Sequence, residues 1–215
     1  ARARFRVNGA VRVTKAVQRD LRWWAAQFQS DTHEGVALAA TAAPAVGDGA
    51  TAIYADASGE QGWMAWAVEG KRLLYVQGQW SDDERRDLII CEKELLASTW
   101  GLVALTPLTT CAFVKSFTDN TVALAAMRSM GSSTARMQLL VARRTAWLYE
   151  HGVIEDAARI TSKANVWADL GSRDRLGEVL RQATAAGLTP TEAVVLPPWR
   201  SLGDEAMAID PNSSA

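Results

Sequence analysis

Histidine and cysteine are scarce in this chain of 215 residues, and neither positive nor negative charge is in clear excess. Only His33 and His151 are present, so a metal site or a nucleophilic site built on histidine has little support. Cys91 and Cys111 are far apart and lack the spacing of a metal-binding pair. We expect both to be core thiols of a protein in a reducing intracellular compartment, the cytoplasm or the nucleus.

Long apolar runs are also missing. No run reaches the roughly 18 residues that a membrane-spanning helix needs, and no signal peptide is visible, so we expect no membrane partner. The chain begins with Ala rather than Met, as a segment of a longer polyprotein would, and it contains no polymerase active-site motif.

The net charge is −1, whereas proteins that bind nucleic acid are usually more basic. That balance still permits such a function, because acidic ligands offset basic residues elsewhere and bound metal ions restore positive charge at the site. A hydrophobic content of 48% is sufficient for a core. There are no internal repeats.

Three regions differ in composition. Residues 1–49 are interpreted as an N-terminal helix and a linker, because apolar side chains recur at helical spacing over 12–29 and positions 32–50 are rich in Ala, Gly and Thr. Residues 50–187 are interpreted as the main domain. Residues 188–215 contain four prolines and are interpreted as an irregular C-terminal tail.

The pattern of the main domain predicts an α/β fold. Short apolar segments separated by turns predict an antiparallel meander, and longer helical patterns then alternate with strands. The predicted order is β-β-β-α-β-α-α-β-α, a mixed five-stranded sheet with helices on both faces. The strands are expected at 51–57, 63–68, 72–79, 111–117 and 153–161, and the helices at 85–105, 121–130, 133–151 and from 165. Small residues at 97 and 101 should let the first helix approach the sheet closely.

Four acidic residues stand in distinctive local sequences. Two follow or end apolar strands and two lie on predicted helices: Asp56 in Tyr-Ala-Asp-Ala-Ser, Glu94 in Glu-Lys-Glu-Leu-Leu-Ala, Asp119 in Phe-Thr-Asp-Asn, and Asp169 in Trp-Ala-Asp-Leu-Gly-Ser-Arg. Carboxylates that strand ends bring together can hold two hard divalent cations, and such a pair can cleave a phosphodiester. Acids crowded in this way repel one another, so we expect raised pKa values and a metal-free form of lower stability.

Each acid also has an ordinary structural interpretation. Asp56 could form a turn at the end of its strand, and Asp119 could cap the following helix. Asp169 could be a first-turn acid favoured by the helix dipole. The pattern alone does not separate Glu94 from Glu92 on the same helix.

The chain resembles the ribonuclease H family, and within it the RNase H domains of retrotransposon reverse transcriptases. The resemblance covers about residues 50–175. It is carried by Asp56-Ala57-Ser58 with Gly62-Trp63, Glu94-Leu95-Leu96-Ala97, Thr118-Asp119-Asn120, and Asn165 with Ala168-Asp169 and Ser172-Arg173. The segment Leu21-Arg22-Trp23-Trp24 is similar to the stretch that joins polymerase and RNase H parts in such elements.

The resemblance implies a metal-dependent endonuclease that hydrolyses the RNA strand of an RNA–DNA hybrid within a retroelement polyprotein, fused to or associated with a reverse transcriptase polymerase domain. It implies two Mg²⁺ ions, for which Mn²⁺ can substitute, held by the four acids. Asp56 would bridge both ions, Glu94 and Asp119 would hold the ion near the attacking water, and Asp169 would hold the ion near the leaving group.

Recognition of a hybrid requires contacts with 2′-hydroxyls and phosphates. The candidates for the 2′-hydroxyls are the backbone groups of Ser58 and Gly59 and the side chain of Asn120. The candidates for the phosphates are basic side chains: Arg128, Arg136, Lys163 and Arg173. In contrast to many family members, the loop 161–164 has no histidine, and Met64-Ala65 follows Trp63. These departures bear on turnover and affinity rather than on the fold.

Other functions remain open at this point. The first is a catalytically inactive module of the RNase H fold that binds nucleic acid or serves as a scaffold, although four repelling carboxylates would then have no use. Proofreading-type exonucleases usually carry a second acid where this chain has Ser58. Integrase-type strand transferases usually end in Glu where it has Asp169.

Overall fold

The computed structural model describes residues 18, 21, 22, 25 and 49–210. The four N-terminal positions are helical. The rest of the helix predicted over 12–29 and most of the predicted linker lie outside the described residues, as do positions 211–215.

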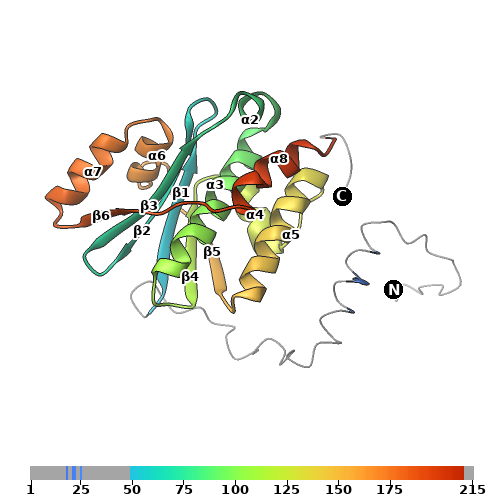
Figure 1. Cartoon of the computed structure of the whole chain (residues 1–215), viewed down its shortest axis with the longest axis horizontal. Coiled ribbons are helices and arrows are strands. Elements are labelled where there is room, and N and C mark those ends of the chain that lie inside the picture. Colours follow the sequence, from blue (N-terminus) through green and yellow to red (C-terminus); the bar gives the residue numbers. More distant parts are fainter. Residues whose placement is uncertain (1–17, 19–20, 23–24, 26–48, 211–215) are drawn as a thin grey trace, which may run out of the picture. The chain divides into compact units, whose positions relative to one another are not determined.

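The centre of the fold is one mixed sheet with the strand order β5-β4-β1-β2-β3-β6 (Figure 1). The first three strands form the predicted antiparallel meander, and the other three pair in parallel with a neighbour. The strands are β1 (Thr51–Ala57), β2 (Gly62–Glu69), β3 (Arg72–Gln79), β4 (Phe113–Thr118), β5 (Ile154–Arg159) and β6 (Thr189–Glu192). The mixed α/β class is confirmed, with one strand more than predicted.

Helices cover both faces of this sheet, as expected (Figure 1). One layer contains α2 (Asp82–Asp87), α3 (Ile90–Leu105), α4 (Thr121–Ser129), α5 (Ala135–Glu150) and α8 (Leu202–Met207). The other contains α6 (Val166–Ser172) and α7 (Leu176–Ala185). A separate apolar cluster lies under each layer. None of the described helices combines the length and the hydropathy that crossing a bilayer requires.

The helix predicted over 85–105 is in fact two helices. A capping box starts α2, because the Ser81 hydroxyl accepts from Glu84 N and the Glu84 carboxylate accepts from Ser81 N. The chain is then extended at Leu88 and Ile89. The Glu92 carboxylate accepts from Ile89 N at 3.1 Å and so starts α3. Two start signals close together therefore divide one apolar pattern into two elements.

The interpretation of 188–215 as an irregular tail is wrong for most of its described part, which contains β6 and α8. Pro190 lies in β6, and proline is tolerated there because β6 is an edge strand. Arg200 ties the segment to the body through an ion pair of 2.8 Å with the buried Glu84. These are tertiary contacts, which the local proline pattern does not reveal.

The expectation that both cysteines are core thiols is met only in part, because Cys91 packs against the main apolar cluster and Cys111 is not part of either described cluster. Cys91 and Cys111 are free, but each is only half-buried. Cys91 lies in the first turn of α3, and Cys111 lies before β4, which begins two residues later than predicted.

The predicted close approach of α3 to the sheet is confirmed. Gly101 faces β2 so closely that an added Cβ would lie 2.4 Å from the Cβ of Ala65. Ala97, one turn earlier, is fully buried. This contact sets the depth of α3 on the sheet, and α3 carries Glu94.

We expect Gly101→Ala to lower the free energy of unfolding by about 2 kcal/mol, because the added methyl group must push α3 away from β2. The loss should appear even though alanine is the better helix former. Urea denaturation measures it.

Gly177→Ala is the matched control, since Gly177 lies on the exposed side of α7 and an added Cβ would meet only Arg181 Nη1 at 3.6 Å. It should leave stability unchanged or raise it by up to about 1 kcal/mol. Equal losses in the two variants would contradict the packing argument.

Candidate metal centre

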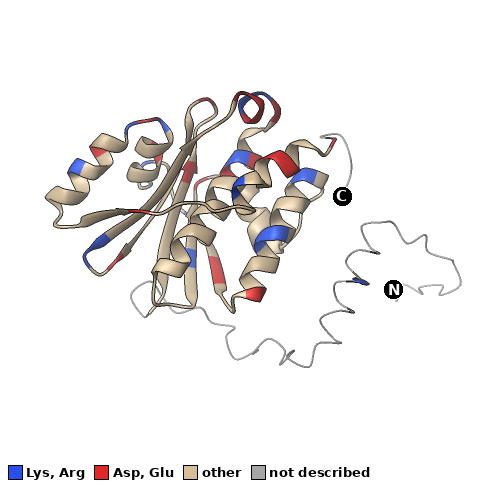
Figure 2. Ribbon diagram, viewed as in Figure 1, with Lys and Arg blue, Asp and Glu red and all other residues tan. Residues whose placement is uncertain are grey.

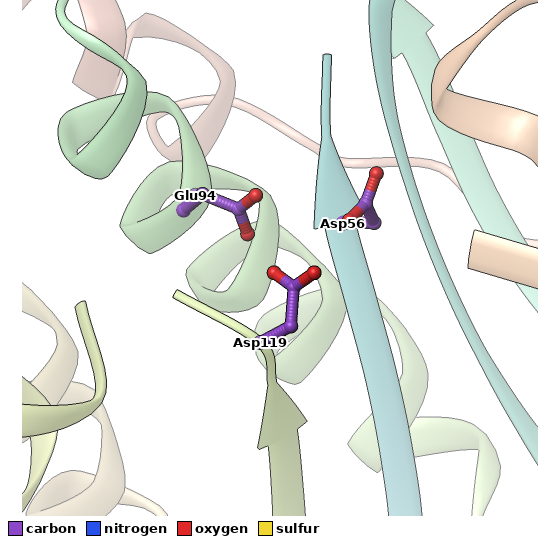
Figure 3. A group of neighbouring side chains, drawn as sticks. All are labelled: Asp56, Glu94 and Asp119. Atoms are coloured by element: carbon purple, nitrogen blue, oxygen red, sulfur yellow. The ribbon is translucent and has the colours of Figure 1, made fainter. Parts of the chain in front are cut away.

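Three of the four predicted acids meet at one end of the sheet (Figure 3). Asp56 is the penultimate residue of β1, and Asp119 directly follows β4, the parallel neighbour of β1. Glu94 projects from α3 toward the same point. One carboxylate oxygen from each lies within 4.8 Å of the others. Parallel strands end at the same edge, so the topology itself brings Asp56 and Asp119 together.

Two of these carboxylates are buried, and their pKa values are raised as expected. Burial raises the pKa of Asp56 to about 6, and the charges of Asp119 and Asp169 add to this effect. Burial raises the pKa of Glu94 to about 9, followed by the charges of Asp56 and Asp119. A divalent cation between these groups would reverse the effect by favouring the ionised forms.

The fourth acid, Asp169 of α6, lies on the same cavity but outside the tight group of three. Its carboxylate is 37% exposed and pairs with Arg173 at 2.8 Å. The cavity has a volume of about 730 Å³ and is lined by all four acids. The structure therefore brings the four acids to one cavity, with three in close contact.

The structure separates Glu94 from Glu92. Glu94 has a carboxylate oxygen within 4.8 Å of those of Asp56 and Asp119, and it accepts from the Thr118 hydroxyl at 3.4 Å. Glu92 starts α3 and lies 3.8 Å from Arg136. Glu92 is thus a buried structural residue, and Glu94 is the candidate ligand.

The residues predicted to read 2′-hydroxyls all line the cavity, but the backbone of one is already engaged. The Ser58 N–H donates to Gly62 O at 2.9 Å, and its carbonyl accepts from Trp80 Nε1 at 2.9 Å. These bonds hold the turn after β1 and occupy the Ser58 N–H, so a contact of the Ser58 backbone with a 2′-hydroxyl stays a prediction for its carbonyl alone. The Gly59 carbonyl accepts from Lys93 Nζ. Asn120 Oδ1 caps α4, so only its amide nitrogen remains for a ligand.

The four basic residues predicted to contact phosphates are placed differently from one another. Arg173 lines the cavity beside Asp169. Lys163 is exposed but does not line the cavity. Arg128 donates to Ala157 O of β5 at 2.8 Å.

The prediction for Arg136 is wrong. Its guanidinium is buried and donates to the carbonyls of Asp87 and Ile209 at 2.6 and 2.9 Å. Helical periodicity did not reveal that α8 and the end of α2 would enclose this side chain.

Sequence reasoning gave no role to several polar residues at the cavity or beside its acids. Arg159 ends β5, the third parallel strand, and lines the cavity. The strand was predicted to continue to residue 161, so the sequence did not indicate that Arg159 stands at its end. The Ser162 hydroxyl donates to Asp119, and the Ser172 hydroxyl donates to Asp56 Oδ2 at 2.6 Å.

The donor set suits a hard divalent cation. The tight group offers only carboxylate oxygens, which Mg²⁺ and Mn²⁺ prefer. Arg173, a basic side chain at the cavity, is paired with Asp169 and lies outside that group. The residues present therefore fit a metal ion.

No family model and no curated protein matches this sequence. Solved structures that are similar to it include two RNase H structures. RNase H1 from the halophilic archaeon Halobacterium salinarum NRC-1 is 13% identical, with a TM-score of 0.47 over 60% of this chain and 99% of that one. The N-terminal RNase H domain of rv2228c from Mycobacterium tuberculosis, fused to maltose-binding protein, is 14% identical, with a TM-score of 0.45 over 62% of this chain and 98% of that one. A similarity of this size does not carry an activity from one protein to the other.

The stability of the metal-free protein should fall as the pH rises. The folded protein raises the pKa of Glu94 from 4.5 to about 9, so between these values the folded state binds more protons than the unfolded state. We expect a loss on the order of 5 kcal/mol between about pH 5 and pH 9, and a much smaller slope in Glu94→Gln. Urea denaturation in EDTA at a series of pH values measures both.

Glu178→Gln is the matched control. Arg175 lowers the pKa of Glu178, so this exposed group is ionised in both states throughout that range. The control should keep the slope of the unmodified protein. A flat profile in the unmodified chain would contradict the prediction.

Mg²⁺ should raise the melting temperature. At about 100 times its Kd, an ion that binds only the folded state adds about 2.7 kcal/mol. Asp119→Asn should lose most of this gain, yet be no less stable without metal, because it removes repulsion at the cluster. Asp156→Asn, at a carboxylate that pairs with Lys115 on β4 at 3.4 Å, should respond to Mg²⁺ as the unmodified chain does. An equal Mg²⁺ response in all three proteins would exclude binding at the cluster.

Proposed function

We propose that this chain is a metal-dependent endonuclease that hydrolyses the RNA strand of RNA–DNA hybrids. The observation that carries the proposal is the convergence of Asp56, Glu94 and Asp119 within 4.8 Å, with Asp169 on the same cavity. These four acids come from four separate segments. They are also the residues that carry the resemblance to the ribonuclease H family.

The four acids would divide the work of holding two ions. Asp56 would bridge them, Glu94 and Asp119 would hold the ion beside the attacking water, and Asp169 would hold the ion beside the leaving oxygen. Two bound Mg²⁺ ions, or Mn²⁺ in their place, would stabilise the attacking and leaving oxygens of the phosphodiester. Burial of Asp56 and Glu94 keeps water away from their carboxylates and strengthens their interaction with a cation.

The hybrid would lie over the open cavity. Asn120 offers its amide nitrogen to a 2′-hydroxyl, and Arg159 and Arg173 offer cations to phosphates. Acidic and basic residues are interspersed along the described part of the ribbon in Figure 2, rather than gathered by sign. Much of the attraction for the nucleic acid must therefore come from the bound ions.

The proposal also covers the larger protein in which this domain would work. The motifs that resemble retrotransposon reverse transcriptases favour a domain that works beside a polymerase, with residues 1–49 as the connecting segment. We place the end of the nuclease domain after α8 rather than at 187, because β6 pairs with β3 and α8 packs on α5.

Cleavage of a labelled RNA–DNA hybrid tests the activity. We expect Mg²⁺-dependent cuts in the RNA strand, and little cleavage of double-stranded DNA or double-stranded RNA. Asp119→Asn should reduce the rate by about 100-fold or more, because it removes a charge from the group that holds the ions. Gel analysis of single-turnover reactions measures both.

Asp156→Asn makes the same chemical change outside the cavity and should retain full activity. A chain that binds the hybrid without cutting it would favour the inactive binding module instead. Equal cleavage by Asp119→Asn and the unmodified chain would show that the cluster is not the active site.

A further inference from the structure

Helix α6 is attached to β1 at two points on either side of Asp169. At its start, Asn165 Nδ2 donates to Ala55 O at 2.9 Å. At its end, the Ser172 hydroxyl donates to Asp56 Oδ2 at 2.6 Å. Asn165, Asp169 and Ser172 have the spacing i, i+4, i+7, which places all three on one side of the helix.

Close packing brings Ser172 within reach of Asp56. The preceding residue, Gly171, lies so near β2 that an added Cβ would be 1.9 Å from Met64 Sδ and 2.8 Å from Met64 Cβ. Ser172 itself is fully buried. Its contact with Asp56 is therefore buried.

The proton of the Ser172 hydroxyl has two acceptors nearby. Asp56 Oδ2 lies at 2.6 Å and the carbonyl of Asp169 at 3.0 Å. A hydroxyl donates one proton, and the shorter bond to a carboxylate is the stronger because the acceptor carries charge. The bond to Asp56 restricts rotation of the carboxylate that lies between α3, β4 and α6.

We propose that Ser172 is a positioning residue that orients the Asp56 carboxylate and thereby sets the affinity of the acidic cluster for divalent cations. Ser172 touches no substrate and is not a catalytic residue. The inference rests on the proposed metal-dependent function. It adds a link between the helix of Asp169 and the carboxylate of Asp56, so that the two acids keep a common geometry.

Ser172→Ala tests this role. The variant should need about 10- to 100-fold more Mg²⁺ for half of the maximal increase in melting temperature, which is the usual cost of losing a group that orients a metal ligand. Cleavage of the hybrid should show the same shift in Mg²⁺ dependence and return near the unmodified rate at saturating Mg²⁺. The KM for the hybrid at saturating Mg²⁺ should not change.

Ser98→Ala is the matched control. Ser98 is equally buried, and its hydroxyl donates to Met127 Sδ at 3.5 Å rather than to a carboxylate. It should keep the unmodified Mg²⁺ dependence. An equal shift in both variants would mean that loss of any buried hydroxyl loosens the site, and would overturn the proposal.

Ser172→Cys covers the case in which Ser172→Ala does not fold. It preserves the volume and supplies a weaker donor, so its Mg²⁺ requirement should lie between those of the unmodified chain and Ser172→Ala. If neither variant folds, Ser172 is a packing residue and the proposal is wrong.

Binding and cleavage separate this proposal from the proposed function. A Mg²⁺-induced rise in melting temperature that depends on Ser172, in a chain that cuts no hybrid, would retain the positioning role and reject the nuclease. Cleavage with unchanged Mg²⁺ dependence in Ser172→Ala would retain the nuclease and reject the positioning role. No Mg²⁺-induced change in the unmodified chain would reject the positioning role as well.

Discussion

The crowding of like charges at the end of β1 is the constraint on which the rest of the arrangement depends. Asp56 and Glu94 are nearly inaccessible to solvent, and Asp119 lies beside them. Such a group repels itself when ionised, and burial increases the cost. It persists only because rigid elements hold each acid in place: two parallel strands, and a helix that packs against the sheet through Gly101. A bound cation would attract each of these carboxylates and so offset their mutual repulsion, which gives the proposed function a thermodynamic basis.

The two layers of helices contribute in different ways. The layer of α3 supplies Glu94 from a buried position. The C-terminal segment packs on this layer, because Arg200 pairs with Glu84 and its guanidinium lies 4.7 Å from the centre of the Trp100 ring. The layer of α6 supplies Asp169 at an exposed position. One side of the site is thus buried, and the other is partly exposed. A nuclease needs both properties, because it must fix its ions and still admit a helical substrate.

The net charge of −1 is less positive than is usual for proteins that bind nucleic acid. Two of the basic side chains with internal partners, Arg136 and Arg144, are buried and join helices to the rest of the fold. The basic groups that line the cavity, Arg159 and Arg173, are few. Binding in such a protein would depend strongly on metal and on salt.

The sequence by itself determined the three-stranded meander and indicated Asp56, Asp119 and Asp169, because the meander strands were short, apolar and bounded by turns and each of these acids stood in a distinctive motif. It also determined that residues 97 and 101 had to be small. It did not separate Glu94 from Glu92, since both lie on one apolar helix, and it assigned Arg136 to the surface. Only the tertiary structure decided these points, along with β6, α8 and the contact of Ser172 with Asp56. The physical reason is that periodicity reports which side of an element is apolar, whereas a polar side chain takes its role from partners that lie far away in the chain and meet it only in the fold.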